Sequence, residues 1–85
     1  MGDNMHRKLV KTTDIEISGR PYTLQYFEQQ TIRGGCRCSC EVVIDAVDRI
    51  ILDDDSMTSL ESKVARLVPA MVYSRLLAAR PSVAA

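Results

Sequence analysis

The sequence predicts an α+β domain: a three- to four-stranded antiparallel meander followed by a C-terminal helix that is kinked at a proline and packed on one face of the sheet. Two observations give this fold class. Apolar and polar side chains alternate in the stretches 9–18, 22–29 and 36–47, which is the period of a strand with one buried face. From residue 58 onwards apolar side chains recur at spacings of three and four, which is the period of an amphipathic helix.

The first two strands are expected to form a hairpin around Gly19, which can adopt the positive φ that a tight turn needs. Ile15 and Ile17 mark the apolar face of the first strand, and the stretch 22–29 returns with the same alternation. Residues 1–7 are polar, and we expect them to be disordered.

A polar segment, 29–35, ends in two glycines and predicts the loop before the third strand. The alternation resumes over 36–47, where the third strand is expected. The apolar run 50–52 is either a short fourth strand or an extension of the third.

The helix is expected to begin between residues 56 and 59, because Thr58 and Glu61 have the spacing of a capping box. The acidic run 53–55 favours the same boundary through the helix dipole. The predicted apolar stripe consists of Leu60, Val64, Leu67, Val68 and Met71. Pro69 has no N–H for the carbonyl of Ala65, so we expect a kink or break at Val68. A second helical piece should end near Arg80, with a loose tail over 81–85.

Length and composition indicate one small domain over residues 1–85, near the size at which a single core gives marginal stability. Its 11 Lys and Arg balance 11 Asp and Glu, which is not the charge pattern of a non-specific nucleic-acid binder. The chain has neither the roughly 18 consecutive apolar residues of a membrane span nor a secretion signal. Its three cysteines, an odd number, agree with a reducing compartment. We therefore expect a cytoplasmic protein without membrane contact.

The segment after Pro69 is apolar nearly all round, and a chain this short has little interior in which to bury a whole helix. We therefore predict a small non-enzymatic protein-interaction domain that binds a second copy of itself, or another protein, through its C-terminal helix. The interface residues would be Met71, Val72, Tyr73, Leu76 and Leu77. The alternative is that most of these side chains belong to an ordinary core.

Nucleic-acid binding is the second hypothesis. Arg33 and Arg37 flank the predicted loop and could meet a phosphate backbone if Arg20 lies beside them, with Tyr22 or Tyr26 stacking on bases. The interspersed acidic residues favour the simpler interpretation that these arginines are solvated surface charges.

Cys36, Cys38 and Cys40 are weak candidates for a metal or redox site. Alternate side chains on a strand lie about 6.5 to 7 Å apart, whereas sulfurs bound to one zinc ion lie about 4 Å apart. His6, the single histidine, lies in the polar N-terminal stretch, so a fourth ligand is also missing. We expect these cysteines to belong to the core, and we predict no metal, no cofactor and no catalytic residue.

Overall fold

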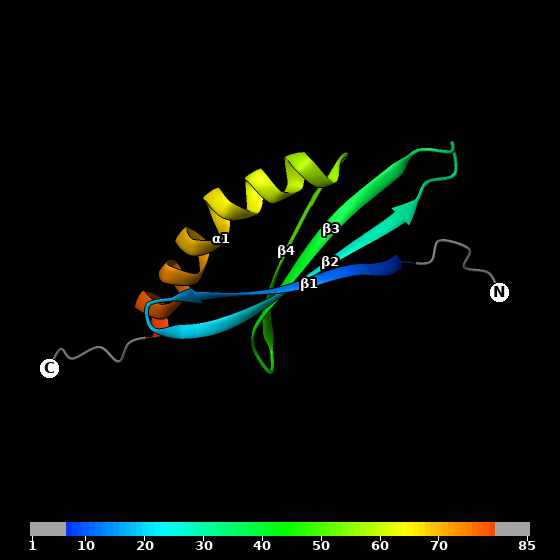
Figure 1. Ribbon diagram of the computed structural model, residues 1–85. Coiled ribbons are helices and arrows are strands. Elements are labelled where there is room, and N and C mark those ends of the chain that lie inside the picture. The colour runs from blue at the N-terminus through cyan, green and yellow to red at the C-terminus, as the bar shows by residue number, and fades with distance from the viewer. Residues whose placement is uncertain (1–6, 80–85) are drawn as a thin grey trace, which may run out of the picture.

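The computed structural model describes residues 7–79, which form one antiparallel sheet and one helix (Figure 1). The strands are β1 (Arg7–Ile17), β2 (Arg20–Gln30), β3 (Cys36–Asp45) and β4 (Asp48–Asp54), and they pair in chain order. The helix α1 (Met57–Ala79) packs on one face of this sheet. The predicted α+β meander is confirmed. The expectations for residues 1–6 and 81–85 lie outside the described residues, and Arg7, which we expected to be disordered, begins β1.

Tight turns join the strands at both ends of the meander. Between β1 and β2, Ser18 and Gly19 both have positive φ, at 53° and 79°, as a two-residue hairpin turn requires. Between β3 and β4, the backbone N–H of Val47 donates to the Asp45 carboxylate at 2.9 Å. Because this turn begins after Asp45, the third strand ends earlier than predicted, and the run 50–52 belongs to a strand of its own, β4.

The core lies between α1 and the sheet. Its sheet side chains are Tyr22, Leu24, Tyr26, Cys38, Cys40, Val42 and Ile50, and its helix side chains are Leu60, Val64, Val68 and Val72. The four helix side chains form a row in which neighbours are four residues apart. Four residues of an α-helix advance about 40° beyond a full turn, so this row moves gradually around the helix axis. Leu67 and Met71, which we placed in the stripe, are only partly buried, and Val72 takes the last core position instead.

The helix α1 begins at Met57, within the predicted range 56–59, but its capping residues differ from the prediction. The backbone N–H of Ser59 donates to Ser56 Oγ at 3.2 Å, and that of Leu60 donates to the Ser56 carbonyl at 2.9 Å, so Ser56 is the N-cap. The predicted capping box of Thr58 and Glu61 is therefore wrong.

Pro69 lies inside a continuous helix, so the break that we considered is absent and only the kink remains. Figure 1 shows the ribbon of α1 turning more steeply in its orange part, which follows Pro69.

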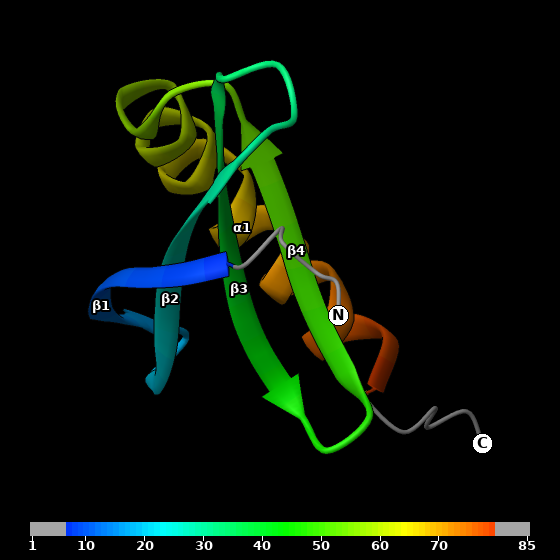
Figure 2. The ribbon, with the colours of Figure 1, turned by 90° about the vertical axis from the view of Figure 1, so that its right-hand side faces the viewer.

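The strand β1 is irregular. Its register with β2 shifts between Leu9 and Lys11, which leaves Val10 as a bulge. Bulges increase the local twist, and Figure 2 shows β1 turned across the direction of β2 and β3. This brings Arg7 to Glu41 of β3 on the sheet face opposite α1, with 2.6 Å between Nη1 and Oε2.

Candidate functional site: an apolar groove between β1 and α1

The helix is held close to one edge of the sheet. Lys63 Nζ lies 3.3 Å from Asp54 Oδ2, and Arg75 Nε donates to Asp48 Oδ2 at 2.8 Å. Both acids belong to β4, so these ion pairs attach one side of α1 to that edge strand. The opposite side of the helix faces β1, and there the helix and the sheet separate.

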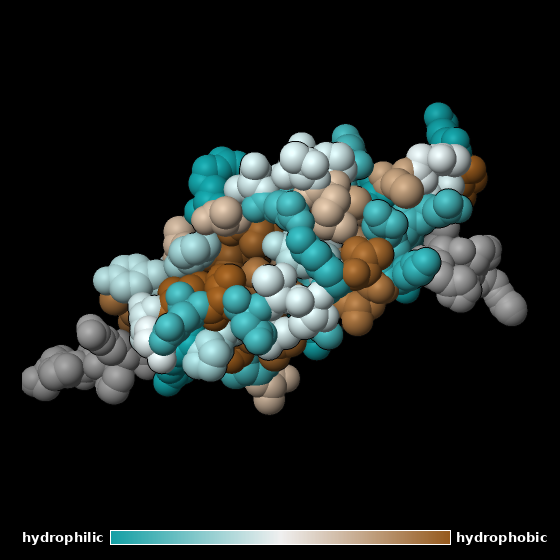
Figure 3. Space-filling view, in the orientation of Figure 1, coloured by the Kyte–Doolittle hydropathy of each residue, from teal (hydrophilic) through white to brown (hydrophobic). Residues whose placement is uncertain are grey.

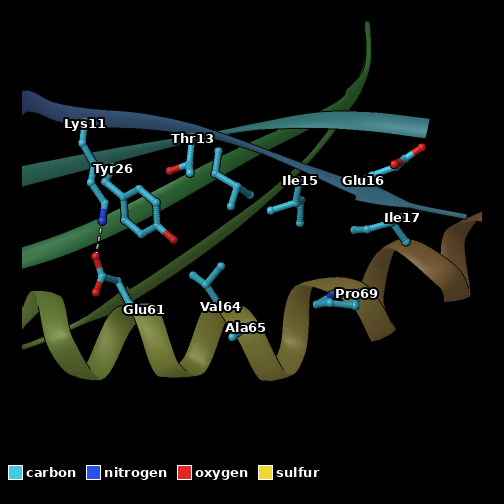
Figure 4. Close-up of a pocket in the computed structure, with 11 residues that line it drawn as sticks. Lys11, Thr13, Ile15, Glu16, Ile17, Tyr26, Glu61, Val64, Ala65 and Pro69 are labelled. Atoms are coloured by element: carbon cyan, nitrogen blue, oxygen red, sulfur yellow. Dashed lines mark hydrogen bonds and ion pairs between the residues drawn. The ribbon is translucent and has the colours of Figure 1, made fainter. Parts of the chain in front are cut away.

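A groove with a volume of about 560 Å³ lies between α1 and the first two strands. Figure 4 shows Ile15 and Ile17 of β1 on one side and Val64, Ala65 and Pro69 of α1 on the other. The side chains of Lys11 and Glu61 form an ion pair that joins the two walls at one end. The lining is mostly apolar, which is typical of a surface that excludes water when it binds a partner.

The apolar surface continues beyond the groove along the helix. Ala65, Pro69, Tyr73 and Leu77 follow one another at spacings of four, so they lie on the same side of α1. Tyr73 and Leu77 are 54% and 48% exposed. Figure 3 shows a brown, apolar area where Figure 1 has the space between β1 and α1. The groove and these two side chains therefore form one surface, which we call the groove surface.

The five residues predicted for the interface occupy three different environments. Val72 is fully buried in the core, so it cannot contact a second chain. Met71 and Leu76 are partly buried and pack against the core. Only Tyr73 and Leu77 are largely exposed. The row of core residues explains this division. Because the row moves gradually around the helix axis, Val72 faces the sheet and Tyr73 faces away from the core.

The contribution of β1 to this surface was not predicted from the sequence. The alternation did identify Ile15 and Ile17 as the apolar face of their strand, and both pack at the margin of the core. No sequence signal indicated that the helix would be placed over β4 and leave these two side chains beside an open groove.

The free edge of β1 borders the same groove. β1 is the first strand of the sheet, and within residues 7–79 it pairs only with β2. An edge strand presents unpaired backbone N–H and C=O groups to which another strand can bind. β1 has 11 residues, and its side chains are exposed from Arg7 to Asp14.

The structure does not bring the three candidate arginines for nucleic-acid binding together. Arg20 begins β2 and Arg33 follows its end, and an 11-residue strand spans roughly 30 Å. Arg37 donates to Asp53 at 3.1 Å and to Asp55 at 2.9 Å, so acidic groups offset its charge. Tyr22 and Tyr26, which we considered for base stacking, are buried beneath the helix.

The three cysteines lie on β3, where Cys36 is exposed and Cys38 and Cys40 are buried in the core. Burial raises the pKa of the Cys40 thiol to about 11 and raises the pKa of Cys38 as well. Burial also raises the pKa of Tyr26, beside Cys40, to about 12. Thiols in such surroundings stay protonated at neutral pH, whereas metal binding and thiol exchange use the thiolate. Among residues 7–79 no three potential metal ligands lie close enough together to hold an ion.

Comparison of the chain with protein-family models, with curated proteins and with solved structures found no match. Within the described part of the chain, α1 is not apolar enough over its length to cross a membrane.

Proposed function

We propose that this chain is a small non-enzymatic protein-interaction domain that forms a homodimer through the groove surface. The observation that carries the proposal is the exposure of Tyr73 and Leu77 beside the groove, in the same row of the helix as Ala65 and Pro69. Large contiguous apolar patches are rare on soluble monomers and mark binding sites. A domain of 85 residues also has a small core, and dimerisation is a common source of additional stability at this size.

The C-terminal helix keeps its predicted role in this proposal, but its contribution is narrower. Tyr73 and Leu77 contact the second copy, Met71 and Leu76 support them from the margin of the core, and Val72 contributes only to folding. The proposal includes a cytoplasmic location, since three free thiols are typical of a reducing compartment.

Analytical ultracentrifugation at micromolar concentration tests the proposal with a matched pair of substitutions. Leu77→Asp places a charge on the groove surface, whereas Val47→Asp makes a similar change in the β3–β4 turn, where the side chain is 92% exposed. We expect the wild type and Val47→Asp to sediment as dimers and Leu77→Asp to sediment as a folded monomer. A monomeric wild type, or a dimer that Leu77→Asp leaves unchanged, would overturn the proposal.

A further inference from the structure

We propose that the second copy binds through its own β1, which pairs antiparallel with β1 of the first, so that the two sheets become one continuous sheet. This inference rests on the proposed self-association and specifies its geometry. It is carried by the free edge of β1, by the distribution of charge along this strand and by the position of the groove beside it.

The first argument is that the two edges of the sheet differ. β4 has only seven residues, four of them charged, and Lys63 of the helix donates to the backbone carbonyl of Asp53 at 2.8 Å. Short, charged and covered edges resist pairing with another strand. β1 has 11 residues and no proline. The edge that is open to strand pairing is therefore that of β1.

The second argument is that the charges of β1 are segregated. Arg7, Lys8 and Lys11 lie in its first part, and Asp14 and Glu16 lie near its end. Antiparallel pairing with an identical strand places the basic part of each copy beside the acidic part of the other, whereas parallel pairing places like charges together. Opposite charges across two strands stabilise the pair and like charges destabilise it. The strand is thus complementary to itself in the antiparallel orientation alone.

Lys8 and Glu16 are the charges of β1 best placed to serve a second chain. Both are exposed, and neither has an ion pair within residues 7–79. By contrast, Arg7 is paired with Glu41, and Lys11 is paired with Glu61. In an antiparallel pairing centred near Thr12, the end of each strand that carries Lys8 lies beside the end of the other that carries Glu16, and this arrangement repeats by symmetry. The bulge at Val10 places Lys8 on the helix face and Glu16 on the opposite face, so the two charges attract each other across the edge of the strand pair without direct contact.

The third argument is that this pairing places the two grooves side by side. A two-fold axis perpendicular to a sheet keeps each face on its own side, so both helices lie on the same face of the combined sheet. The two grooves then adjoin each other across the paired β1 strands. The half-exposed Ile15 and Ile17 come to lie within a wider sheet instead of at its edge. Strand pairing therefore brings the two groove surfaces next to each other in a single arrangement.

Charge reversal tests the orientation of the strands. Lys8→Glu makes positions 8 and 16 both acidic, and Glu16→Lys makes both basic. Each single variant should therefore dimerise at least about tenfold more weakly at low salt. The double variant Lys8→Glu with Glu16→Lys restores complementarity only if the strands are antiparallel. We expect its dissociation constant, measured by sedimentation, to return to within about threefold of the wild-type value.

Hydrogen exchange provides a readout that does not depend on charge. Only the alternate amides of β1 that face away from β2 should exchange more slowly at high protein concentration than at low concentration, while those of β4 stay unchanged. If the wild type is a dimer that Leu77→Asp dissociates, but β1 gains no protection and the double variant is as weak as the single ones, strand pairing is overturned and the proposed function stands. A monomeric wild type overturns both.

Discussion

Replacing Leu60 with alanine tests the packing of the helix on the sheet, because this side chain is fully buried in the core. The change removes three carbon atoms, which at about 0.8 kcal/mol each corresponds to a loss of about 2.4 kcal/mol of transfer free energy. A residual cavity of about 50 Å³ would add about 1.2 kcal/mol at about 24 cal/mol per Å³. We therefore expect a cost of about 3.5 kcal/mol, within the usual range for buried leucines.

Thermal and urea unfolding, followed by circular dichroism at one fixed protein concentration, measure this cost. For a domain of 85 residues, about 3.5 kcal/mol corresponds to a decrease in Tm of roughly 14 to 28 °C. Leu67→Ala is the matched control, since Leu67 is only partly buried on the flank of the helix and should cost about 1 kcal/mol. Equal costs for the two variants, or a cost below about 1 kcal/mol for Leu60→Ala, would refute the assignment of the buried row.

Two further predictions concern the buried ionisable groups. The folded-state pKa values of Cys40 and Tyr26, about 11 and about 12, exceed the ordinary values of 9.0 and 10.0, so the folded chain binds more protons than the unfolded chain in this range. Their contribution to the free energy of unfolding is complete below pH 9.0 and is lost as the pH rises to about 12. The urea concentration at the unfolding midpoint should therefore fall between neutral pH and about pH 10, and a constant midpoint would contradict this. With a thiol-reactive dye, we expect Cys36 to react at once and Cys38 and Cys40 to react only after unfolding, whereas immediate reaction of all three would contradict their burial.

Much of the fold could be predicted from the sequence because its periodicities are local. The alternation around Ile15 and Ile17, and again from Cys36, identified strands that the structure contains, and the spacing of Leu60 and Val64 identified the helix. Short connections then favour a meander, since consecutive antiparallel strands joined by tight turns pair with one another. The turn at Gly19 followed from its conformational freedom alone.

The elements that could not be predicted depend on tertiary contacts. Glu61 has the spacing of a capping residue, but it pairs instead with Lys11, a residue fifty positions away, while Ser56 caps the helix. Val72 and Tyr73 are neighbours in an apolar segment, and only the path of the helix over a twisted sheet decides that the first is buried and the second exposed. Periodicity shows which residues share a face, but it does not show where that face is placed.

The location of the candidate site follows from an asymmetry in the ion pairs of the helix. Lys63 and Arg75 attach α1 to β4, whereas among residues 7–79 the helix has a single ion pair with β1, from Glu61 at one end of the groove. A single helix on a four-stranded sheet cannot cover its whole face, so attachment to one edge leaves the other edge open. That open edge is the strand whose basic first part and acidic last part carry the antiparallel pairing that we propose. The acids that hold the helix over β4 therefore also determine which edge remains free to bind a second chain.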